Sequence, residues 1–349
     1  MSYSALIAMS GGVDSTVAAL LTIQDSATCA GATMVLFGND FKELSLSSLG
    51  LPSGDSPVFD IPFYTFDFRE IFTRQVIEPF IDEYKNARTP NPCVVCNNKI
   101  KFGAFLNKAL EMGKDYIVTG HYAQIGQDAN RRYLLKKGVD AKKDQSYVLY
   151  TLSQEQLARI KLPLGALTKS QVRKIAADAG LLNAESKESQ DICFIPDGDY
   201  AKFIVNHTGK TTQKGRFVDT SDKDLGENKG ILHYTIGQRR GLGLSMPHPP
   251  YVIDINSENN TVTVGKNEEL YSKAFEIKNI NLIACDKIDT TIRAQVKIRY
   301  SDPGHSASVT QTDENTIHIE FNEPQRAITR GQSAVIYDGD VVVGGGIVF

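Results

Sequence analysis

Short apolar segments alternate with amphipathic segments over about the first 200 residues. Four apolar segments have the length and composition of buried strands: 4–9, 30–37, 61–66 and 116–122. Four other segments are typical of helices: 16–21, 70–85 with an interruption at Pro79, 99–113, and 169–179, which Gly180 ends. This alternation predicts an α/β domain whose parallel sheet carries helices on both faces. Residues 38–60 are rich in Gly, Ser, Pro and Asp and are predicted to form a long loop.

Beyond about residue 205 the hydrophobic period changes to two. Strands separated by turn residues are predicted at 251–255, 261–264, 291–300 and 316–321. We therefore expect one or two small β-rich, barrel-like modules after the α/β domain. The change of period places one boundary near residue 205, and a weaker one falls near residue 270. The predicted domains are residues 1–204, 205–270 and 271–349.

A glycine-rich motif, Ser-Gly-Gly-Val-Asp-Ser at 10–15, stands between the first strand and the first helix. Two glycines let the backbone turn tightly, and the N–H groups of a helix N-terminus favour an anion. The loop contains no lysine, so it is not a Walker-type loop, and Asp14 fits there if a divalent cation accompanies the phosphates. A turn that binds nothing is the alternative. The complete string resembles the pyrophosphate loop of the ATP pyrophosphatases, which cleave ATP to AMP and pyrophosphate while adenylating a substrate.

Composition excludes several classes of protein. The 349 residues, 41% hydrophobic and 23% charged, are typical of a globular protein of two or three domains, and no apolar run approaches the length that spans a bilayer. No secretory signal is visible, so we expect a cytoplasmic protein without a membrane partner. The net charge of -3 does not by itself favour a nucleic-acid partner. Residues 88–143, however, contain eleven Lys and Arg against four Asp and Glu, which indicates either an RNA-binding region or a solvated basic face.

Three of the five cysteines require a chemical explanation. Cys29 and Cys285 lie in apolar or mixed segments and are expected to be inert. Cys93 and Cys96 form a C-x-x-C motif in a loop that two prolines make rigid, and Cys193 is the third thiol. A C-x-x-C motif is typical of a redox pair, half of a zinc site or part of an iron–sulfur site. Two structural thiols, or a zinc site completed by His121 or His207, are the alternatives.

Seven sequence motifs occur in order along the chain. They are S-G-G-V-D-S, R-T-P-N-P-x-x-x-C-N from Arg88, T-G-H-Y from Thr119, K-D-Q-S-Y from Lys143, I-C-F-I around Cys193, T-I-G-Q-R-R-G-L-G from Thr235 and G-Q-S-A-V from Gly331. Together they resemble the bacterial tRNA-specific 2-thiouridylases, which place sulfur on C2 of the wobble uridine of certain tRNAs. The resemblance covers nearly the whole chain. It implies an adenine-nucleotide hydrolase-like N-terminal domain followed by two small β-rich domains.

The resemblance also implies a role for particular residues. ATP, with Mg²⁺, would bind Ala8, Met9, Ser10, Gly11, Gly12, Val13, Asp14, Ser15, Met34 and Gly120. The uridine O2 is adenylated, sulfur then attacks C2, and AMP departs. Cys193 would carry a persulfide, Cys96 would attack it or release its sulfur, and a disulfide bond belongs to this chemistry. The tRNA anticodon arm would contact Asn91, Pro92, Cys93, His121, Lys143, Asp144, Gln145, Arg299, Tyr300 and Gln332. A donor protein or sulfide would supply the sulfur.

Two positions depart from the family pattern. Many members carry Asp where this chain has Cys93, so Cys93, Cys96 and Cys193 are also candidate ligands of one four-iron four-sulfur cluster, as in the cluster-dependent tRNA thiolases. In the persulfide alternative, a nearby cation must help to form the thiolate, and Lys99 is the candidate. The second departure is the segment 38–60, which is shorter than in the family and contains no Trp.

Three other functions compete with this interpretation. An amide-forming ATP pyrophosphatase would share the loop at 10–15 but would not need three thiols. A thiolase that acts on another RNA would need both features. An RNA-binding protein with a relict nucleotide site is the non-catalytic alternative, and the intact Ser10, Asp14 and Ser15 argue against it.

Overall fold

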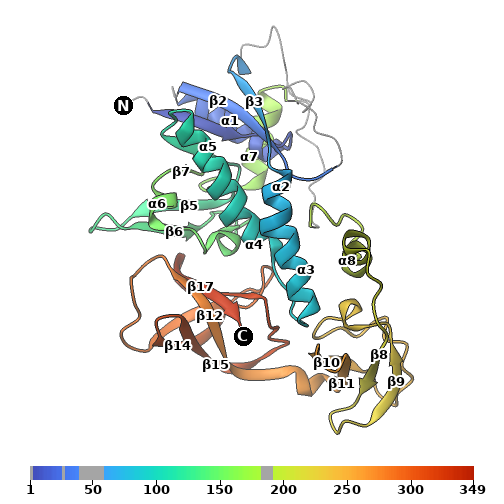
Figure 1. Cartoon of the computed structure of the whole chain (residues 1–349). Coiled ribbons are helices and arrows are strands. Elements are labelled where there is room, and N and C mark those ends of the chain that lie inside the picture. Colours follow the sequence, from blue (N-terminus) through green and yellow to red (C-terminus); the bar gives the residue numbers. More distant parts are fainter. Residues whose placement is uncertain (1–2, 26–27, 39–58, 182–191) are drawn as a thin grey trace.

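The computed structural model describes residues 3–25, 28–38, 59–181 and 192–349, and Figure 1 shows their arrangement. Its N-terminal domain is built on a five-stranded parallel sheet in the order β3-β2-β1-β4-β7. The strands are β1 (Ser4–Ala8), β2 (Thr28–Val35), β3 (Phe63–Asp67), β4 (Tyr116–Val118) and β7 (Ile160–Lys161). The parallel sheet that the alternating pattern predicted is thus confirmed. Most of the segment 38–60 lies outside the described residues.

Helices cover both faces of this sheet, as predicted. Alternate residues of β1 point to opposite faces: Ala5 and Ile7 pack with α1 (Val13–Gln24) and α7 (Lys169–Asp178), while Leu6 faces the other core. That core contains the helices α2 (Arg69–Phe72), η3 (Thr73–Ile77), α3 (Glu78–Lys85), α4 (Pro92–Cys96), η4 (Asn97–Ala104) and α5 (Phe105–Glu111). The short helices η5 (Ser146–Leu149) and α6 (Gln154–Leu157) precede β7.

Two helical runs change their winding in the middle. The predicted helix 70–85 continues through Pro79, and a π-helical segment, η3, ends immediately before the turn that contains this proline. A π-helix widens the turn, which accommodates a residue without an N–H donor. The run from Pro92 to Glu111 likewise contains the π-helical segment η4. It ends at Gly113, whose φ of 70° lies in the left-handed region that glycine adopts easily.

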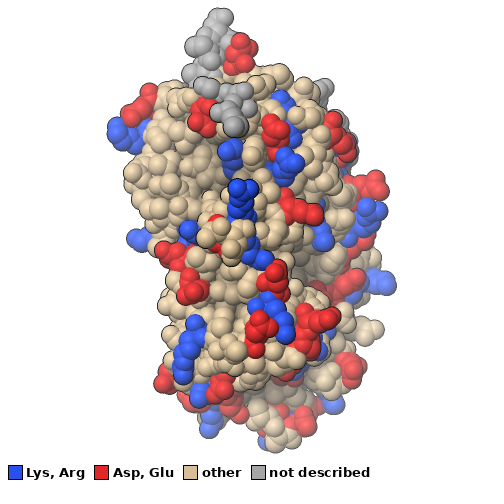
Figure 2. Space-filling model, turned by 90° about the vertical axis from the view of Figure 1, so that its left-hand side faces the viewer, with Lys and Arg blue, Asp and Glu red and all other residues tan. Residues whose placement is uncertain are grey.

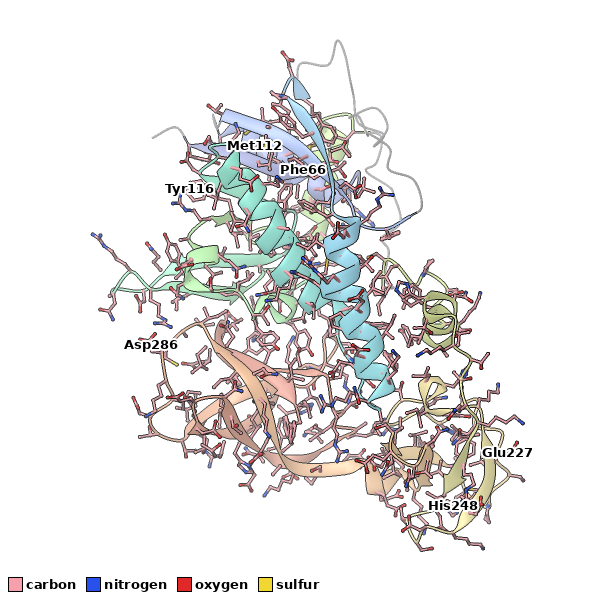
Figure 3. The ribbon with its side chains drawn as sticks, viewed as in Figure 1. Phe66, Met112, Tyr116, Glu227, His248 and Asp286 are labelled. Carbon is pink, nitrogen blue, oxygen red and sulfur yellow. The ribbon has the colours of Figure 1, made fainter. Side chains whose placement is uncertain are left out.

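A hairpin that the sequence pattern did not reveal connects the first and last domains. Strands β5 (Ala123–Gln127) and β6 (Tyr133–Lys137) extend the C-terminal sheet through β17 (Val341–Val348). At its tip, the Arg132 guanidinium donates to the carbonyl oxygens of Ile283 and Cys285 at 2.6 and 2.7 Å, and pairs with Asp286 at 2.6 Å. Figure 3 shows Asp286 on the C-terminal domain beside this hairpin. The N-terminal and C-terminal domains are therefore joined by backbone pairing and by partly buried hydrogen bonds.

The remaining chain forms two β-rich units. Helix α8 (Tyr200–Thr208) leads into a four-stranded sheet in the order β10-β11-β8-β9, around a core that includes Phe217, Val252 and Val262. Its elements are β8 (Gly215–Val218), β9 (Asp224–Asn228), η6 (Ile231–His233), β10 (Tyr251–Asn256), β11 (Thr261–Gly265) and η7 (Asn267–Leu270). The predicted boundary between residues 204 and 205 falls within α8, and we keep the three-domain division as a proposal.

Six strands of the last unit close into a barrel. They follow the order β12-β15-β14-β13-β16-β17, and β12 also pairs with β17, which completes the ring. The strands are β12 (Tyr271–Leu282), β13 (Ile292–Lys297), β14 (His305–Asp313), β15 (Thr316–Arg326), β16 (Ser333–Asp338) and β17. The barrel-like C-terminal architecture is confirmed. Within the described part of the chain, no helix has the length and apolar character needed to cross a membrane.

Candidate active site

The loops that follow β1 and β4 meet at one pocket of about 270 Å³. These strands are neighbours in the sheet, so their carboxyl ends open on the same edge, where ligands of parallel α/β sheets bind. The pocket is lined by Ala8, Met9, Ser10, Asp14, Ser15, Thr33, Met34, Leu36, Lys101, Thr119, Gly120, His121 and Gln145. Most of the predicted nucleotide residues therefore share a pocket with two of the predicted tRNA residues.

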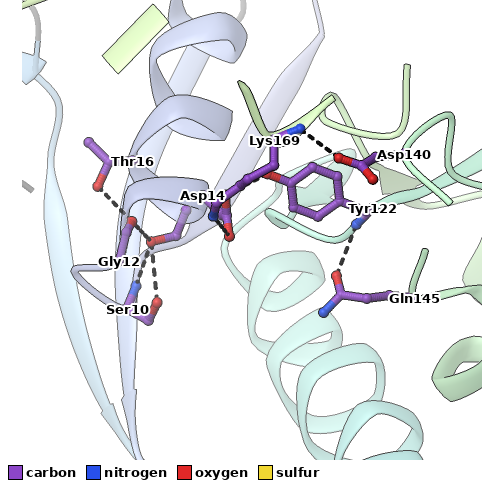
Figure 4. A network of polar contacts seen from close by, with 9 residues as sticks. Ser10, Gly12, Asp14, Thr16, Tyr122, Asp140, Gln145 and Lys169 are labelled. Atoms are coloured by element: carbon purple, nitrogen blue, oxygen red, sulfur yellow. Dashed lines mark hydrogen bonds and ion pairs between the residues drawn. The ribbon is translucent and has the colours of Figure 1, made fainter. Parts of the chain in front are cut away.

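The glycine-rich loop is held by hydroxyl groups. Gly11 has a φ of 80°, in the left-handed region, and extended Gly12 begins α1 without a side-chain cap. The Ser15 hydroxyl donates to the Gly12 carbonyl oxygen at 2.9 Å and lies 3.2 Å from the Ser10 hydroxyl (Figure 4). The hydroxyls hold the loop open, and the N–H groups of the first turn of α1 lie beside it. This arrangement suits a phosphate group.

Gly120 lies where two backbone segments pack too closely to leave room for a side chain. A Cβ at this position would stand 2.8 Å from the carbonyl carbon of Asp14 and 2.9 Å from the amide nitrogen of Ser15. Any side chain would therefore push the β4 loop away from the N-terminus of α1. Because Gly120 has no side chain, the two loops can pack together as one wall of the pocket.

Asp14 has a cationic partner that the sequence did not suggest. The Lys169 ammonium lies 2.7 and 2.8 Å from the two carboxylate oxygens of Asp14, and the Tyr122 hydroxyl donates to the same carboxylate at 2.7 Å. Figure 4 shows this network, including the Lys169 backbone N–H that donates to the Asp140 carboxylate at 2.9 Å. The Lys169 side chain is only 10% exposed. The loop at 10–15 contains no lysine, but Lys169, the first residue of α7, places its ammonium beside Asp14.

A signal for Lys169 was present in the sequence. Thr168 precedes the predicted helix, and the structure shows a capping box in which Thr168 and Gln171 bond each other's backbone N–H groups. The N-terminus of a helix that follows a parallel strand tends to lie at the carboxyl edge of the sheet. A lysine in the first helical position was therefore a candidate for the pocket.

His121 is buried and neutral. Its Nδ1 lies 2.7 Å from the Thr119 hydroxyl, and its ring packs against Phe102 at 5.5 Å between centroids. Burial, together with the charge of Lys101, lowers the pKa of His121 well below its usual value. Nearby, the Gln145 side-chain oxygen accepts the Tyr122 N–H at 2.9 Å.

The thiols lie on and beside the helical run that borders this pocket. Asn91 caps α4 by accepting the backbone N–H of Cys93 at 3.1 Å, which leaves Cys93 exposed and Cys96 buried. Cys193 is exposed, and all three thiols are free. Burial above all, with a smaller contribution from the neighbouring thiols Cys193 and Cys93, raises the pKa of Cys96 to about 11. Lys101 opposes this effect, so Lys101, and not the expected Lys99, is the cation that acts on Cys96.

The described residues around the three thiols offer no site for a single metal ion. Among residues 3–25, 28–38, 59–181 and 192–349, no group of three or more His, Cys, Asp or Glu side chains could hold a metal ion. No zinc site with His121 or His207 forms among these residues. The thiols of Cys93 and Cys193 lie close enough to Cys96 to raise its pKa, and a four-iron four-sulfur cluster on the three thiols stays a prediction.

The residues predicted to contact tRNA lie in separate parts of the structure. Arg299 and Gln332 border a second pocket, of about 420 Å³, between the domains, where Gln332 donates to the Thr89 carbonyl oxygen at 2.8 Å. Tyr300, 45% exposed, lies beside them in the chain. Asp144 is buried and accepts the backbone N–H groups of Gly138 and Ser146, so its visible role is to hold the loop. Asn91 and Pro92 lie at the start of α4, next to the thiols.

Comparison with known proteins identifies the family. Models described as the tRNA methyl transferase HUP domain, the tRNA methyl transferase PRC-barrel domain and the aminomethyltransferase beta-barrel domain match residues 4–197, 201–266 and 272–348. The tRNA-specific 2-thiouridylase MnmA of Clostridioides difficile is 48% identical over 355 residues, covering 100% of this chain and 98% of the relative. The chain belongs to the tRNA-specific 2-thiouridylase family.

Further relatives of the 2-thiouridylase family agree with this assignment. The protein of the same name from Acetivibrio thermocellus is 46% identical, covering 98% of both chains. The NMN synthetase structure from Francisella tularensis is 14% identical, with a TM-score of 0.32 over 61% of this chain and 79% of that chain, and no argument rests on it. The resemblance inferred from seven motifs is confirmed over the full length of the chain.

The basic region 88–143 is not a uniform patch. Figure 2 shows basic and acidic side chains interspersed over the face that carries the β5–β6 hairpin. Several cations of residues 88–143 are engaged in ion pairs: Arg88 with Glu83, Lys108 with Glu111 and Arg132 with Asp286. An RNA-binding role for this region therefore stays a prediction.

Proposed function

We propose that this protein is an ATP-dependent tRNA sulfurtransferase that replaces the C2 oxygen of the wobble uridine with sulfur. One observation carries the proposal: the phosphate-type loop and the helical run bearing Cys96 border the same region, with Lys101 lining the pocket and acting on the thiol. The names of the full-length relatives support the tRNA substrate.

In this proposal the loop 10–15 binds the phosphates of ATP. The N–H groups at the start of α1 and the hydroxyls of Ser10 and Ser15 would contact phosphate oxygens. Met34 and Gly120 would border the adenine and ribose, since both line the pocket. A Mg²⁺ ion held by Asp14 and phosphate oxygens would neutralise the charge that builds up on pyrophosphate. Asp14 fits this role, provided that Lys169 moves from the carboxylate toward the phosphates.

The chemistry then proceeds in two displacements. The uridine O2 attacks the α-phosphorus, and pyrophosphate leaves, so that the oxygen becomes part of a good leaving group. Cys193 carries a persulfide, whose terminal sulfur is transferred to C2 as AMP leaves. The Cys96 thiolate attacks the inner sulfur of that persulfide, which breaks its S–S bond and forms a Cys96–Cys193 disulfide. A dithiol reductant then restores both thiols. Exposure of Cys193 supports its role as the acceptor of the outer sulfur from a persulfide on a donor protein, which leaves the donor as a free thiol.

The remaining sites would hold the anticodon arm. Asn91, Pro92 and Cys93 would contact the target base, because they stand at the start of the helix that carries Cys96. His121, Lys143 and Gln145 would contact the RNA beside the nucleotide pocket, and buried Asp144 would hold the loop that carries Lys143 and Gln145. Arg299, Tyr300 and Gln332 would contact it from the C-terminal domain, where the exposed ring of Tyr300 offers a stacking surface. We expect this reaction in the cytoplasm.

One assay separates this proposal from its alternatives. Pyrophosphate and AMP release are measured with ATP alone, with unmodified tRNA, with another structured RNA, and with ammonia and a carboxylate substrate. The proposal predicts that only tRNA containing the wobble uridine stimulates release. Stimulation by ammonia and a carboxylate would identify an amide-forming synthetase. Stimulation by the other RNA would identify a thiolase that acts on an RNA other than tRNA.

A further inference from the structure

Tyr122 closes the T-G-H-Y motif, and the proposed reaction gives it no role. Its hydroxyl donates to Oδ1 of Asp14 at 2.7 Å, and the Lys169 ammonium contacts Oδ1 and Oδ2 of the same carboxylate at 2.7 and 2.8 Å (Figure 4). Among the described residues, Oδ1 therefore has two partners and Oδ2 has one. The two partners differ in kind, since Lys169 carries its charge on a flexible stem of four carbons, whereas the Tyr122 hydroxyl stands on a rigid ring.

Two sets of contacts fix Tyr122 in place. Its side chain is 2% exposed and belongs to the core that α1 and α7 share with the parallel sheet. Its backbone N–H donates to the Gln145 side-chain oxygen at 2.9 Å, and its carbonyl oxygen accepts the Gln145 N–H at 2.8 Å. Gly138 packs against the same peptide, because a Cβ there would stand 2.8 Å from the Tyr122 carbonyl oxygen. The Tyr122 hydroxyl therefore has a fixed position beside Asp14.

Binding of ATP with Mg²⁺ would replace one of these partners and spare the other. Proteins commonly hold Mg²⁺ by one or two carboxylates together with substrate phosphates, and Asp14, which lines the pocket beside the phosphate-type loop, fits this pattern. An ammonium and a divalent cation on one carboxylate repel each other, so Lys169 would leave Asp14. The neutral Tyr122 hydroxyl carries no such repulsion. It can keep Oδ1 while Oδ2 becomes available to the incoming cation.

We propose that Tyr122 is a positioning residue of the nucleotide site, which holds Oδ1 of Asp14 so that Oδ2 is presented to the cation that accompanies the phosphates of ATP. Tyr122 acts through Asp14 in this role. Without its hydroxyl, the Asp14 carboxylate would lose its fixed orientation once Lys169 leaves. The inference rests on the proposed function in one respect, the binding of ATP by the loop at 10–15, and it does not depend on sulfur transfer.

The test compares nucleotide affinity with and without the cation. A non-hydrolysable ATP analogue is titrated into the full-length protein by calorimetry, once with Mg²⁺ and once with EDTA. Tyr122→Phe keeps the ring in the core and removes only the hydroxyl. It should weaken binding about 10-fold or more with Mg²⁺, because a hydrogen bond to a charged group is lost, and should leave binding in EDTA within about twofold of wild type.

Tyr116→Phe is the matched control. Tyr116 is the first residue of β4, on the strand that leads to Tyr122, and its hydroxyl makes no hydrogen bond in the part of the chain that the structure describes. This variant should bind the analogue with wild-type affinity under both conditions. In an Asp14→Asn background, Tyr122→Phe should cause no further loss with Mg²⁺, because the hydroxyl acts through the Asp14 carboxylate.

Each outcome decides the proposal. Wild-type affinity of Tyr122→Phe with Mg²⁺ overturns it, and so does an equal loss with Mg²⁺ and with EDTA, which would mean that the hydroxyl only supports the shape of the pocket. If the wild-type protein does not bind the analogue, the proposed function and this inference fail together. The Tyr122 effect in a protein that makes no 2-thiouridine refutes the proposed function alone. Thiolation of tRNA without the Tyr122 effect refutes this inference alone.

Discussion

Removing the Lys169 ammonium should destabilise the N-terminal domain by leaving Asp14 half-satisfied. The Asp14 carboxylate is 29% exposed and the Lys169 side chain 10% exposed, so the pair is largely shielded from water. In Lys169→Met, the Tyr122 hydroxyl is the contact that remains of the three short bonds to this carboxylate. The methionine keeps the apolar stem of the side chain, so the change isolates the charge.

The size of the effect follows from the burial of the pair. Exposed ion pairs contribute about 0–1 kcal/mol, and breaking a fully buried pair costs about 3–5 kcal/mol. The Lys169–Asp14 pair lies between these limits, so we expect a loss of about 1–3 kcal/mol. For a domain of about 200 residues this corresponds to a fall in Tm of roughly 2–12 °C. Lys174→Met on the same helix breaks an exposed pair with Asp178 and should lower Tm by less than about 2 °C.

The assay is differential scanning calorimetry of a double-mutant cycle, following the transition of the N-terminal domain. Asp14→Asn removes the charge that Lys169→Met leaves unpaired, so the double variant should be more stable than the sum of the two single changes predicts. If Lys169→Met unfolds at the same temperature as Lys174→Met, or if the two changes at 14 and 169 are additive, the ion pair does not stabilise the domain and our account of the network is wrong.

Three further predictions concern the proposed reaction. Asp14→Ala or Ser15→Ala should abolish AMP formation while the circular dichroism spectrum stays unchanged, because the loop binds phosphate and packs little core; near-normal turnover would show that the loop is not the site. Affinity for tRNA should fall about tenfold or more between 50 and 200 mM salt if residues 88–143 contact several phosphates, and a flat salt response would argue against them. Cys93→Ala should keep activity in air with a persulfide donor, and the wild-type protein should contain no iron after anaerobic purification; joint loss of iron and activity in Cys93→Ala would favour a cluster.

Local patterns were sufficient for much of the fold. The apolar segment at 4–9, the glycine pair at 11 and 12, and the period of the following helix together predict a strand, a tight turn and a helix N-terminus, and β1 and α1 confirm them. The period-two segments 291–300 and 316–321 likewise predict two of the barrel strands, β13 and β15. In these cases the signal lies within a few residues of the element that it specifies.

Features that depend on distant parts of the chain were not predicted. Lys169 meets Asp14 across 155 positions, and although the helix start at Thr168 marks Lys169 as a candidate for the pocket, no local pattern identifies Asp14 as its partner. The β5–β6 hairpin belongs to a sheet whose other strands come from the last 80 residues or so, which only the folded structure shows. The sequence suggests Lys99 as the cation near the thiols, whereas Lys101 acts on the pKa of Cys96. The π-helical winding of η4, which changes the side chains that share a face, does not follow from the hydrophobic period.

The central claim is tested most directly by the product. Unmodified tRNA is incubated with the protein, Mg²⁺, ATP and a persulfide donor labelled with ³⁴S, and the digested nucleosides are analysed by mass spectrometry. The account predicts one labelled 2-thiouridine derivative at the wobble position for each AMP released, and none with Ser15→Ala. AMP release without labelled 2-thiouridine, or label at another nucleoside, would contradict it.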